Sequence, residues 1–196
     1  MAEGAQDAAG DTARHVLLVG MMGAGKSTVG PLVASRLGWS FVDTDQVVEH
    51  DTGKTVRELF AEGGEKLFRA EEARALAGVL ALRAPTVVSV GGGAVMLPGN
   101  RTIIGSSGTV VWLRAAPRTL ASRVGDGASR PLISTEAETL EALARIESER
   151  RPLYEEVSDA VVDTDVIDAG EVAGRVVELV RVAPSRPAQR SGGRAP

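Results

Sequence analysis

The chain has 196 residues, a formal net charge of -4, no cysteine and only two histidines. This length suffices to bury the core of one domain without disulfides or a structural metal. The lack of cysteine excludes thiolate catalysis and cysteine-based zinc sites, and two histidines leave little room for a Ser-His-Asp triad. The acidic balance argues against a general nucleic-acid binder. Acid–base chemistry must therefore depend on carboxylates.

The two ends of the chain have the composition of disordered tails. Residues 1–13 are rich in Ala, Gly and Asp, and residues 183–196 are rich in Pro, Gly, Ser and Arg. The first of these segments is acidic, whereas a signal peptide needs a basic region and an apolar core, and no apolar run reaches membrane-spanning length. We therefore expect a cytoplasmic protein with a single domain at residues 14–182 between two disordered tails.

Between the tails, short apolar runs typical of strands alternate with longer amphipathic runs typical of helices. This alternation predicts an α/β fold with a parallel sheet and helices on both of its faces. Ligands of such sheets bind at the carboxyl ends of the strands. The segments after these strands are indeed rich in Gly, Asp and Arg. The expected strands are 15–20, 40–43, 86–90, 109–113 and 160–163, and the expected helices are 26–37, 45–51, 56–62, 65–82, 98–105, 116–124, 140–157 and 171–182.

The segment GMMGAGKST, residues 20–28, lies between the first expected strand and the first expected helix. Its glycines let backbone N–H groups turn inward around phosphate oxygens at a helix N-terminus. Lys26 is expected to reach the β- and γ-phosphates, and the hydroxyl of Ser27 to ligate magnesium. The motif predicts nucleotide binding but does not choose among a kinase, a GTPase and a motor. Pro31, further along the same helix, is expected to bend it.

Two aspartates, Asp43 and Asp45, follow the second expected strand. Residues two apart in an extended segment point to the same side, here toward the phosphate loop. Asp43 could hold magnesium, directly or through water, and Asp45 could accept the proton of an incoming hydroxyl group. One of the two, or Thr44 between them, could instead cap the helix that begins here.

Two further segments bear groups that suit a second substrate. Arg69 lies in the expected helix 65–82, where Glu72 can pair with it and fix its direction. Three glycines, Gly91, Gly92 and Gly93, directly follow the third strand, where a backbone must approach a ligand closely or adopt positive φ. An arginine in a helix is more often a solvated or surface-paired group, and the glycines could form a simple turn.

The C-terminal third contains the remaining candidate arginines. The stretch GDGASRPLI places Arg130 in a segment whose glycines and small polar residues suggest a mobile lid at about residues 125–139, closing over the transferring phosphate. A solvated loop arginine is the alternative. Arg150 and Arg151 are adjacent in a helix, so at most one of them faces the cleft, because neighbouring helical residues point about 100° apart.

The segments GMMGAGKST, DTD, FRAEE, GGGAV, SRPLI and RRPLY, in this order and at these intervals, closely resemble the shikimate kinase family. The resemblance covers about residues 16–182. The sequence GKS alone is common to many families, but this combination is highly specific. The resemblance implies a fold like that of nucleoside monophosphate kinases, with a five-stranded parallel sheet in the order 2-3-1-4-5.

The resemblance also implies roles for individual residues. Asp43 lies near magnesium together with Ser27, and Asp45 is the base that bonds the hydroxyl group to be phosphorylated. Arg69 and Arg150 clamp the carboxylate of shikimate, and Arg151 then occupies a variable position. The implied catalytic residues are Asp45, Lys26 and Arg130. The implied substrate-binding residues are Asp45, Arg69, Gly91, Gly92, Gly93 and Arg150. The implied ATP-binding residues are Gly23, Ala24, Gly25, Lys26, Ser27, Thr28, Arg123, which stacks near adenine, and Arg130.

The implied reaction transfers the γ-phosphate of ATP to the 3-hydroxyl of shikimate, with magnesium, in aromatic amino-acid biosynthesis. We expect a monomer that acts on shikimate and ATP, with no nucleic-acid or membrane partner. A related kinase for another small hydroxy acid and a catalytically silent nucleotide-binding regulator are the alternatives. The loop 163–171 lacks the basic and proline residues that some family members place beside adenine, so the preference among nucleotides is left open.

Overall fold

A computed structural model describes residues 15–124 and 136–182 of the chain. Five strands form one parallel sheet in the order β2-β3-β1-β4-β5, which confirms the predicted fold class. The predicted tails, residues 125–135 of the predicted lid and Arg130 lie outside the described residues. The strands are β1 (His15–Val19), β2 (Ser40–Asp43), β3 (Thr86–Ser89), β4 (Gly108–Arg114) and β5 (Ala160–Asp163).

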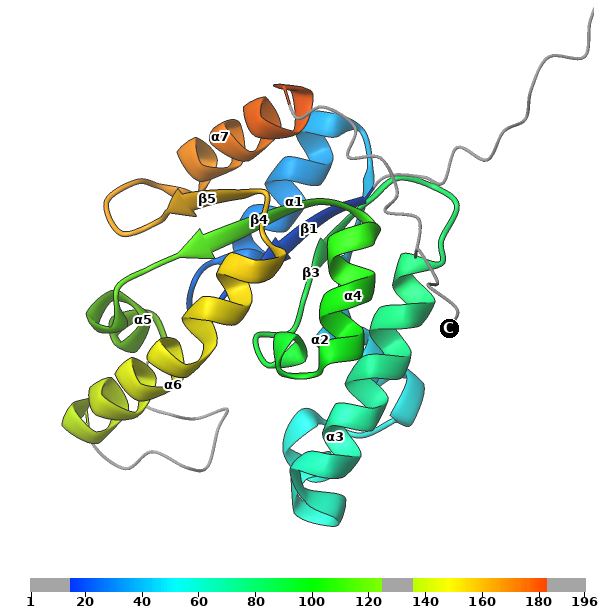
Figure 1. Cartoon of the computed structure of the whole chain (residues 1–196), viewed down its shortest axis with the longest axis vertical. Coiled ribbons are helices and arrows are strands. Elements are labelled where there is room, and N and C mark those ends of the chain that lie inside the picture. Colours follow the sequence, from blue (N-terminus) through cyan, green and yellow to red (C-terminus); the bar gives the residue numbers. More distant parts are fainter. Residues whose placement is uncertain (1–14, 125–135, 183–196) are drawn as a thin grey trace, which may run out of the picture.

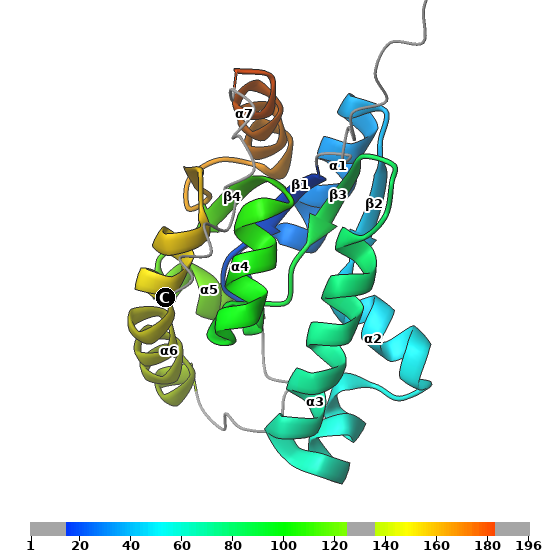
Figure 2. The ribbon, with the colours of Figure 1, turned by 45° about the vertical axis from the view of Figure 1, so that its right-hand side comes forward.

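Helices cover both faces of this sheet. Figure 1 shows α1 and α7 packed together on one face, with α4 and α6 on the other. In Figure 2, α3 runs beside α4, and α2 lies next to α3. No helix in the described ranges is both long and apolar enough to span a bilayer. The helices are α1 (Lys26–Leu37), α2 (Thr44–Thr52), α3 (Val56–Leu80), the 3-10 helix η1 (Ala94–Met96), α4 (Pro98–Ser106), α5 (Pro117–Val124), α6 (Glu136–Val157) and α7 (Ala169–Val182).

The helix α3 begins and bends where its sequence requires. Thr55 and Glu58 form a capping box, in which the Thr55 hydroxyl accepts from the Glu58 N–H and the Glu58 carboxylate accepts from the Thr55 N–H. Gly64 has φ 65° and ψ -166°, a conformation that interrupts the helix. The two predicted helices 56–62 and 65–82 therefore correspond to the two arms of one kinked element.

Two other elements differ from the sequence prediction. Helix α6 begins at Glu136, four residues before the predicted start at residue 140, and η1 was not predicted. Helix α1 continues through Pro31, which lies on its exposed side. The proline therefore does not end the helix.

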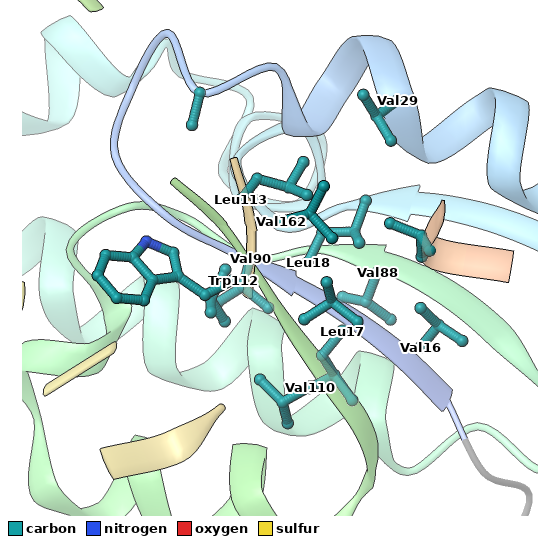
Figure 3. Packing of buried hydrophobic residues seen from close by; sticks show 14 of the residues in the cluster. Val16, Leu17, Leu18, Val29, Val88, Val90, Val110, Trp112, Leu113 and Val162 are labelled. Atoms are coloured by element: carbon teal, nitrogen blue, oxygen red, sulfur yellow. The ribbon is translucent and has the colours of Figure 1, made fainter. Parts of the chain in front are cut away.

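The central strands are buried on both faces, which explains their nearly continuous apolar sequences. Successive side chains of a strand point to opposite faces. Figure 3 shows Leu18 and Leu113 on the side of Val29 of α1, and Val110 and Trp112 on the opposite side, and all five are buried. This packing fixes the sheet, and all of the strands end at the same edge because they are parallel.

Candidate active site

A cavity of about 430 Å³ opens where β1, β2 and β3 end. A smaller recess of about 30 Å³ adjoins it and shares Asp45, Gly92 and Arg150 with it. The residues that line the cavity come from the last residues of β2 and β3, from the segments that follow β1 and β3, and from the helices α1, α2, α5 and α6. They are Met22, Gly23, Gly25, Lys26, Ser27, Thr28, Asp43, Asp45, Ser89, Val90, Gly92, Arg123 and Arg150.

The phosphate loop after β1 needs glycine at defined positions. Gly20 has φ 141°, and a side chain there would collide with the backbone oxygen of Leu113. Gly25 has φ 95° and caps α1. The Lys26 ammonium donates to the Gly20 and Met21 carbonyls at 2.8 and 3.0 Å, which holds it within the loop. A positive charge and a helix N-terminus thus meet at one end of the cavity.

Asp43 joins the phosphate loop to the start of α2. Its Oδ2 atom accepts a 2.6 Å hydrogen bond from the Ser27 hydroxyl, and its Oδ1 atom accepts from the Asp45 N–H at 3.0 Å. Asp43 is therefore both the cap of α2 and the partner of Ser27, so the two interpretations that the sequence left open are compatible. The paired oxygens of Ser27 and Asp43 are the ligand type that magnesium prefers.

Thr44 makes a contact that the sequence did not predict. Its hydroxyl accepts a 2.9 Å hydrogen bond from the N–H of Gly91, and the cap of α2 is Asp43. The suggestion that Thr44 might cap the helix is therefore wrong. No local signal connects these two residues, because they lie 47 positions apart.

Arg69 is held between two carboxylates of its own helix. Its Nη1 atom donates to Glu72 at 2.7 Å, which confirms the predicted pairing, and its Nε and Nη2 atoms donate to Glu65 at 3.2 and 3.1 Å. Only 15% of the Arg69 side chain and 1% of the Glu72 side chain are exposed. The guanidinium lies against Gly93, where any side chain would collide with it. These contacts direct Arg69 into the recess that contains Asp45 and Arg150.

Burial and charge act in opposite directions on this pair. Burial raises the pKa of Glu72, Arg69 opposes that rise, and the nearby carboxylate of Asp45 adds to it. Burial alone would lower the pKa of Arg69, but Glu72 and Glu65 outweigh it and raise that pKa. Arg69 therefore remains a cation whose charge is already shared with protein carboxylates.

Arg150 and Arg151 point in different directions. Arg150 lines both the cavity and the recess, and its Nη1 atom donates to the Gly92 carbonyl at 3.1 Å. The Arg151 side chain is 46% exposed and pairs with Glu147 at 2.7 Å. The structure thus answers the question that spacing left open, and Arg150 is the residue that faces the cleft.

The comparisons with known proteins agree with this arrangement. The family model for shikimate kinase matches residues 22–181. The chain belongs to the shikimate kinase family. A shikimate kinase of Moorella thermoacetica is 41% identical over 168 residues, covering 85% of this chain and 94% of that protein. One of Halorhodospira halophila is 42% identical over 177 residues, covering 89% and 97%.

Solved structures of the shikimate kinase family have the same architecture. The structure titled shikimate kinase from Acinetobacter baumannii in complex with shikimate gives a TM-score of 0.81 at 33% identity, covering 87% of this chain and 94% of that one. A gluconokinase from Sinorhizobium meliloti gives a TM-score of 0.54 at 18% identity. The latter likeness extends to the fold alone.

The glycine triplet approaches two acidic side chains of the recess closely. A Cβ atom at Gly91 would lie 2.5 Å from Oε1 of Glu72 and 2.8 Å from Oδ1 of Asp45. None of the three glycines has a positive φ. Positive φ is therefore not the reason for glycine here, and Gly91 has no room for a side chain beside Glu72 and Asp45. The predicted approach of this backbone to a ligand stays a prediction.

Arg123 connects two segments on the nucleotide side of the cavity. Its Nη1 atom donates to the Thr164 hydroxyl at 3.0 Å and to the Gly23 carbonyl at 3.4 Å, and its Nη2 atom donates to the Thr164 backbone oxygen. Thr164 belongs to the loop 163–171, and the sequence did not single it out. Every described site residue of the prediction lines the cavity or the recess except Ala24, which is buried within its loop, and Gly91, which precedes Gly92.

Proposed function

We propose that this chain transfers the γ-phosphate of ATP to the 3-hydroxyl of shikimate, giving shikimate 3-phosphate and ADP. The observation that carries the proposal is that Asp45 and Arg150 line the same cavity as Lys26, while Arg69 lines the recess beside them. Cationic groups suited to a carboxylate and a carboxylate suited to a hydroxyl therefore lie beside a phosphate loop. The shikimate kinase family uses ATP as its phosphate donor.

The acceptor is proposed to be held at its two ends. Arg69 and Arg150 would donate to its carboxylate, and each charge-assisted hydrogen bond contributes about 2 kcal/mol. Asp45 would accept the proton of the 3-hydroxyl and align the oxygen with the γ-phosphate. Lys26 would donate to the β- and γ-phosphates. Arg130 and Arg123 are proposed to bind ATP as well, the former closing over the transferring phosphate.

Ser27 and Asp43 would hold magnesium. Their oxygen atoms lie 2.6 Å apart, and magnesium is usually bound by one or two protein oxygens together with substrate phosphates. When bound, the ion would neutralise charge on the β- and γ-phosphates. The same two side chains also connect the N-termini of α1 and α2, because Ser27 belongs to α1 and Asp43 caps α2.

Two other functions predict different acceptors. A related kinase would phosphorylate another small hydroxy acid, such as gluconate, and the paired arginines would suit its carboxylate too. A silent nucleotide-binding regulator would transfer phosphate to nothing. The presence of Lys26, Asp45 and Arg130 favours a catalyst, since a silent protein has no need of all three.

An acceptor screen separates these functions. ADP release would be measured with ATP and magnesium in the presence of shikimate, gluconate, a nucleoside monophosphate or no acceptor. We expect strong stimulation by shikimate at millimolar concentration and little by the others. Stimulation by another acid instead would favour the related kinase, and tight ATP binding without transfer would favour the regulator. Gel filtration of the same sample would test the predicted monomer, and the cytoplasmic location stays a prediction.

A further inference from the structure

We propose that Thr44 and Tyr154 are positioning residues that brace the glycine loop, Gly91–Gly93, and thereby set the separation of Asp45 from Arg150. The loop is held from two sides by hydroxyl groups. The Thr44 hydroxyl accepts from the Gly91 N–H at 2.9 Å, and the Tyr154 hydroxyl donates to the Gly92 carbonyl at 2.6 Å. The proposal rests on the proposed function, because it concerns how the site for shikimate is held.

Thr44 connects the loop to the proposed base. It is fully buried and is the first residue of α2, directly before Asp45. A branched side chain such as threonine has few rotamers, so its hydroxyl is a rigid acceptor. Because Thr44 and Asp45 are consecutive, fixing Gly91 on the Thr44 hydroxyl also fixes the loop relative to the Asp45 carboxylate.

Tyr154 connects the loop to the proposed carboxylate clamp. It follows Arg150 by four residues on α6, so both side chains project from the same helix face. Both donate to one atom, the Gly92 carbonyl oxygen, which has two lone pairs to receive them. The Tyr154 ring is fully buried and stacks on Trp112, with the ring centroids 5.6 Å apart. Burial raises the pKa of Tyr154 to about 12, so its hydroxyl remains a donor at neutral pH.

The shared carbonyl gives Tyr154 a task during substrate binding. If Arg150 turns a donor toward an acceptor carboxylate, Tyr154 still satisfies the Gly92 carbonyl, which would otherwise lose its partners. A peptide unit is planar, so fixing the Gly92 carbonyl also fixes the N–H of Gly93. Within residues 15–124 and 136–182, the N–H groups of Gly92 and Gly93 have no hydrogen-bond acceptor. The brace would therefore fix the orientation of the Gly93 N–H, a backbone donor that is available for the substrate.

The test uses variants that remove one hydroxyl and little volume, namely Thr44→Val and Tyr154→Phe. We expect each to raise the KM for shikimate by about tenfold, the effect of losing one hydrogen bond of about 1.4 kcal/mol, while the KM for ATP changes less than about twofold. Thr44→Ser, which keeps the hydroxyl, should restore most of the wild-type KM. Matched controls are Thr86→Val, a buried threonine at the far end of β3, and Ser158→Ala, directly after the last residue of α6, and neither should change the KM for shikimate.

The outcomes separate this proposal from the proposed function. A normal KM for shikimate in both variants would overturn the brace, as would equal changes in the two KM values accompanied by a lower melting temperature. If the wild-type chain does not turn over shikimate, the proposed function fails, and amide hydrogen exchange of the segment 88–97 then decides the brace. Faster exchange in both variants than in the wild type and the controls supports it, and unchanged exchange overturns it.

Discussion

The nucleotide side of the cavity and the acceptor side are built in different ways. On the nucleotide side, the phosphate loop and the start of α1 supply most of the groups as one continuous segment, to which α5 adds Arg123. Lys26 is held by carbonyls of its own loop. On the acceptor side, Asp45, Arg69, Gly92 and Arg150 come from separate segments of the chain. Their contacts run between these segments, as in the hydrogen bonds of Arg150 to Gly92 and of Gly91 to Thr44.

This difference determines how far a substitution spreads. A group held by its own loop can be removed with little effect beyond that loop. A group held by a distant partner leaves that partner unsatisfied, and a buried unsatisfied group costs more than the contact itself contributed. On the acceptor side, a substitution that removes the partner of a charged group should therefore change both the KM for shikimate and the free energy of unfolding. Where the partner is neutral, only the KM for shikimate should change.

The largest effect is expected at Asp45, where the two sides meet. Asp45→Asn keeps the size of the side chain but removes the proposed base. We expect kcat to fall by about 10²- to 10⁴-fold, because general-base catalysis contributes about that much. The affinity for ATP, measured by calorimetry, should remain within about twofold of the wild type. Near-normal turnover would remove Asp45 from the role of base.

Arg69→Ala should have the next largest effect, because its partner is a buried carboxylate. Without Arg69, Glu72 remains buried with no opposite charge at 2.7 Å. We expect the KM for shikimate to rise by about 10- to 100-fold and the free energy of unfolding to fall by about 2 kcal/mol. Urea denaturation measures the second quantity. An unchanged free energy of unfolding would show that other groups compensate the charge of Glu72. Loss of a charged partner on the acceptor side would then not lower the stability of the protein.

Arg150→Ala should raise the KM for shikimate without the loss of stability. Its hydrogen-bond partner is the neutral Gly92 carbonyl, which Tyr154 continues to satisfy. We expect a rise of about 10- to 100-fold, the effect of one charge-assisted contact, and a free energy of unfolding within about 0.5 kcal/mol of the wild type. The matched control is Arg151→Ala, whose side chain is 46% exposed. If the control raised the KM instead, the roles of the two arginines would be exchanged.

The sequence predicts contacts within one segment better than contacts between distant segments. The alternation of strands and helices and the phosphate loop were predictable because periodicity and glycine spacing are local signals. The pairing of Arg69 with Glu72 was predictable for the same reason, since the two lie three residues apart on one helix. The strand order was implied by the family resemblance, and periodicity alone does not give it. The choice of Arg150 over Arg151 as the residue that faces the cleft could come from the family resemblance but not from spacing.

Contacts between distant segments were not predictable. The bond from Gly91 to Thr44 spans 47 positions, and that from Tyr154 to Gly92 spans 62. Both bonds depend on how the sheet brings the ends of different strands together. Local sequence patterns do not predict this. The spacing of Tyr154 from Arg150 was the one available signal, because residues four apart share a helix face. The bridge from Arg123 to Thr164 depends in the same way on where α5 meets the end of β5.

The smallest expected effect concerns pH and tests whether Glu72 resists ionisation. Burial raises the pKa of Glu72 above its ordinary value of 4.5, with Arg69 opposing that rise and Asp45 adding to it. A group whose pKa is raised by folding contributes stability that is fully present below its ordinary pKa and is lost as the pH rises through the pKa of the folded state. Glu72→Gln cannot ionise and should not lose that contribution. The free energy of unfolding of the variant minus that of the wild type should therefore increase as the pH rises from about 4.5 toward neutrality, as urea denaturation across this range would show.

The same variant should raise the KM for shikimate a few-fold, because Arg69 keeps Glu65 but loses its buried charged partner. If the two proteins instead show parallel pH profiles, the Glu72 carboxylate is as easily ionised in the folded protein as in the unfolded chain, and the charge on Arg69 compensates it fully.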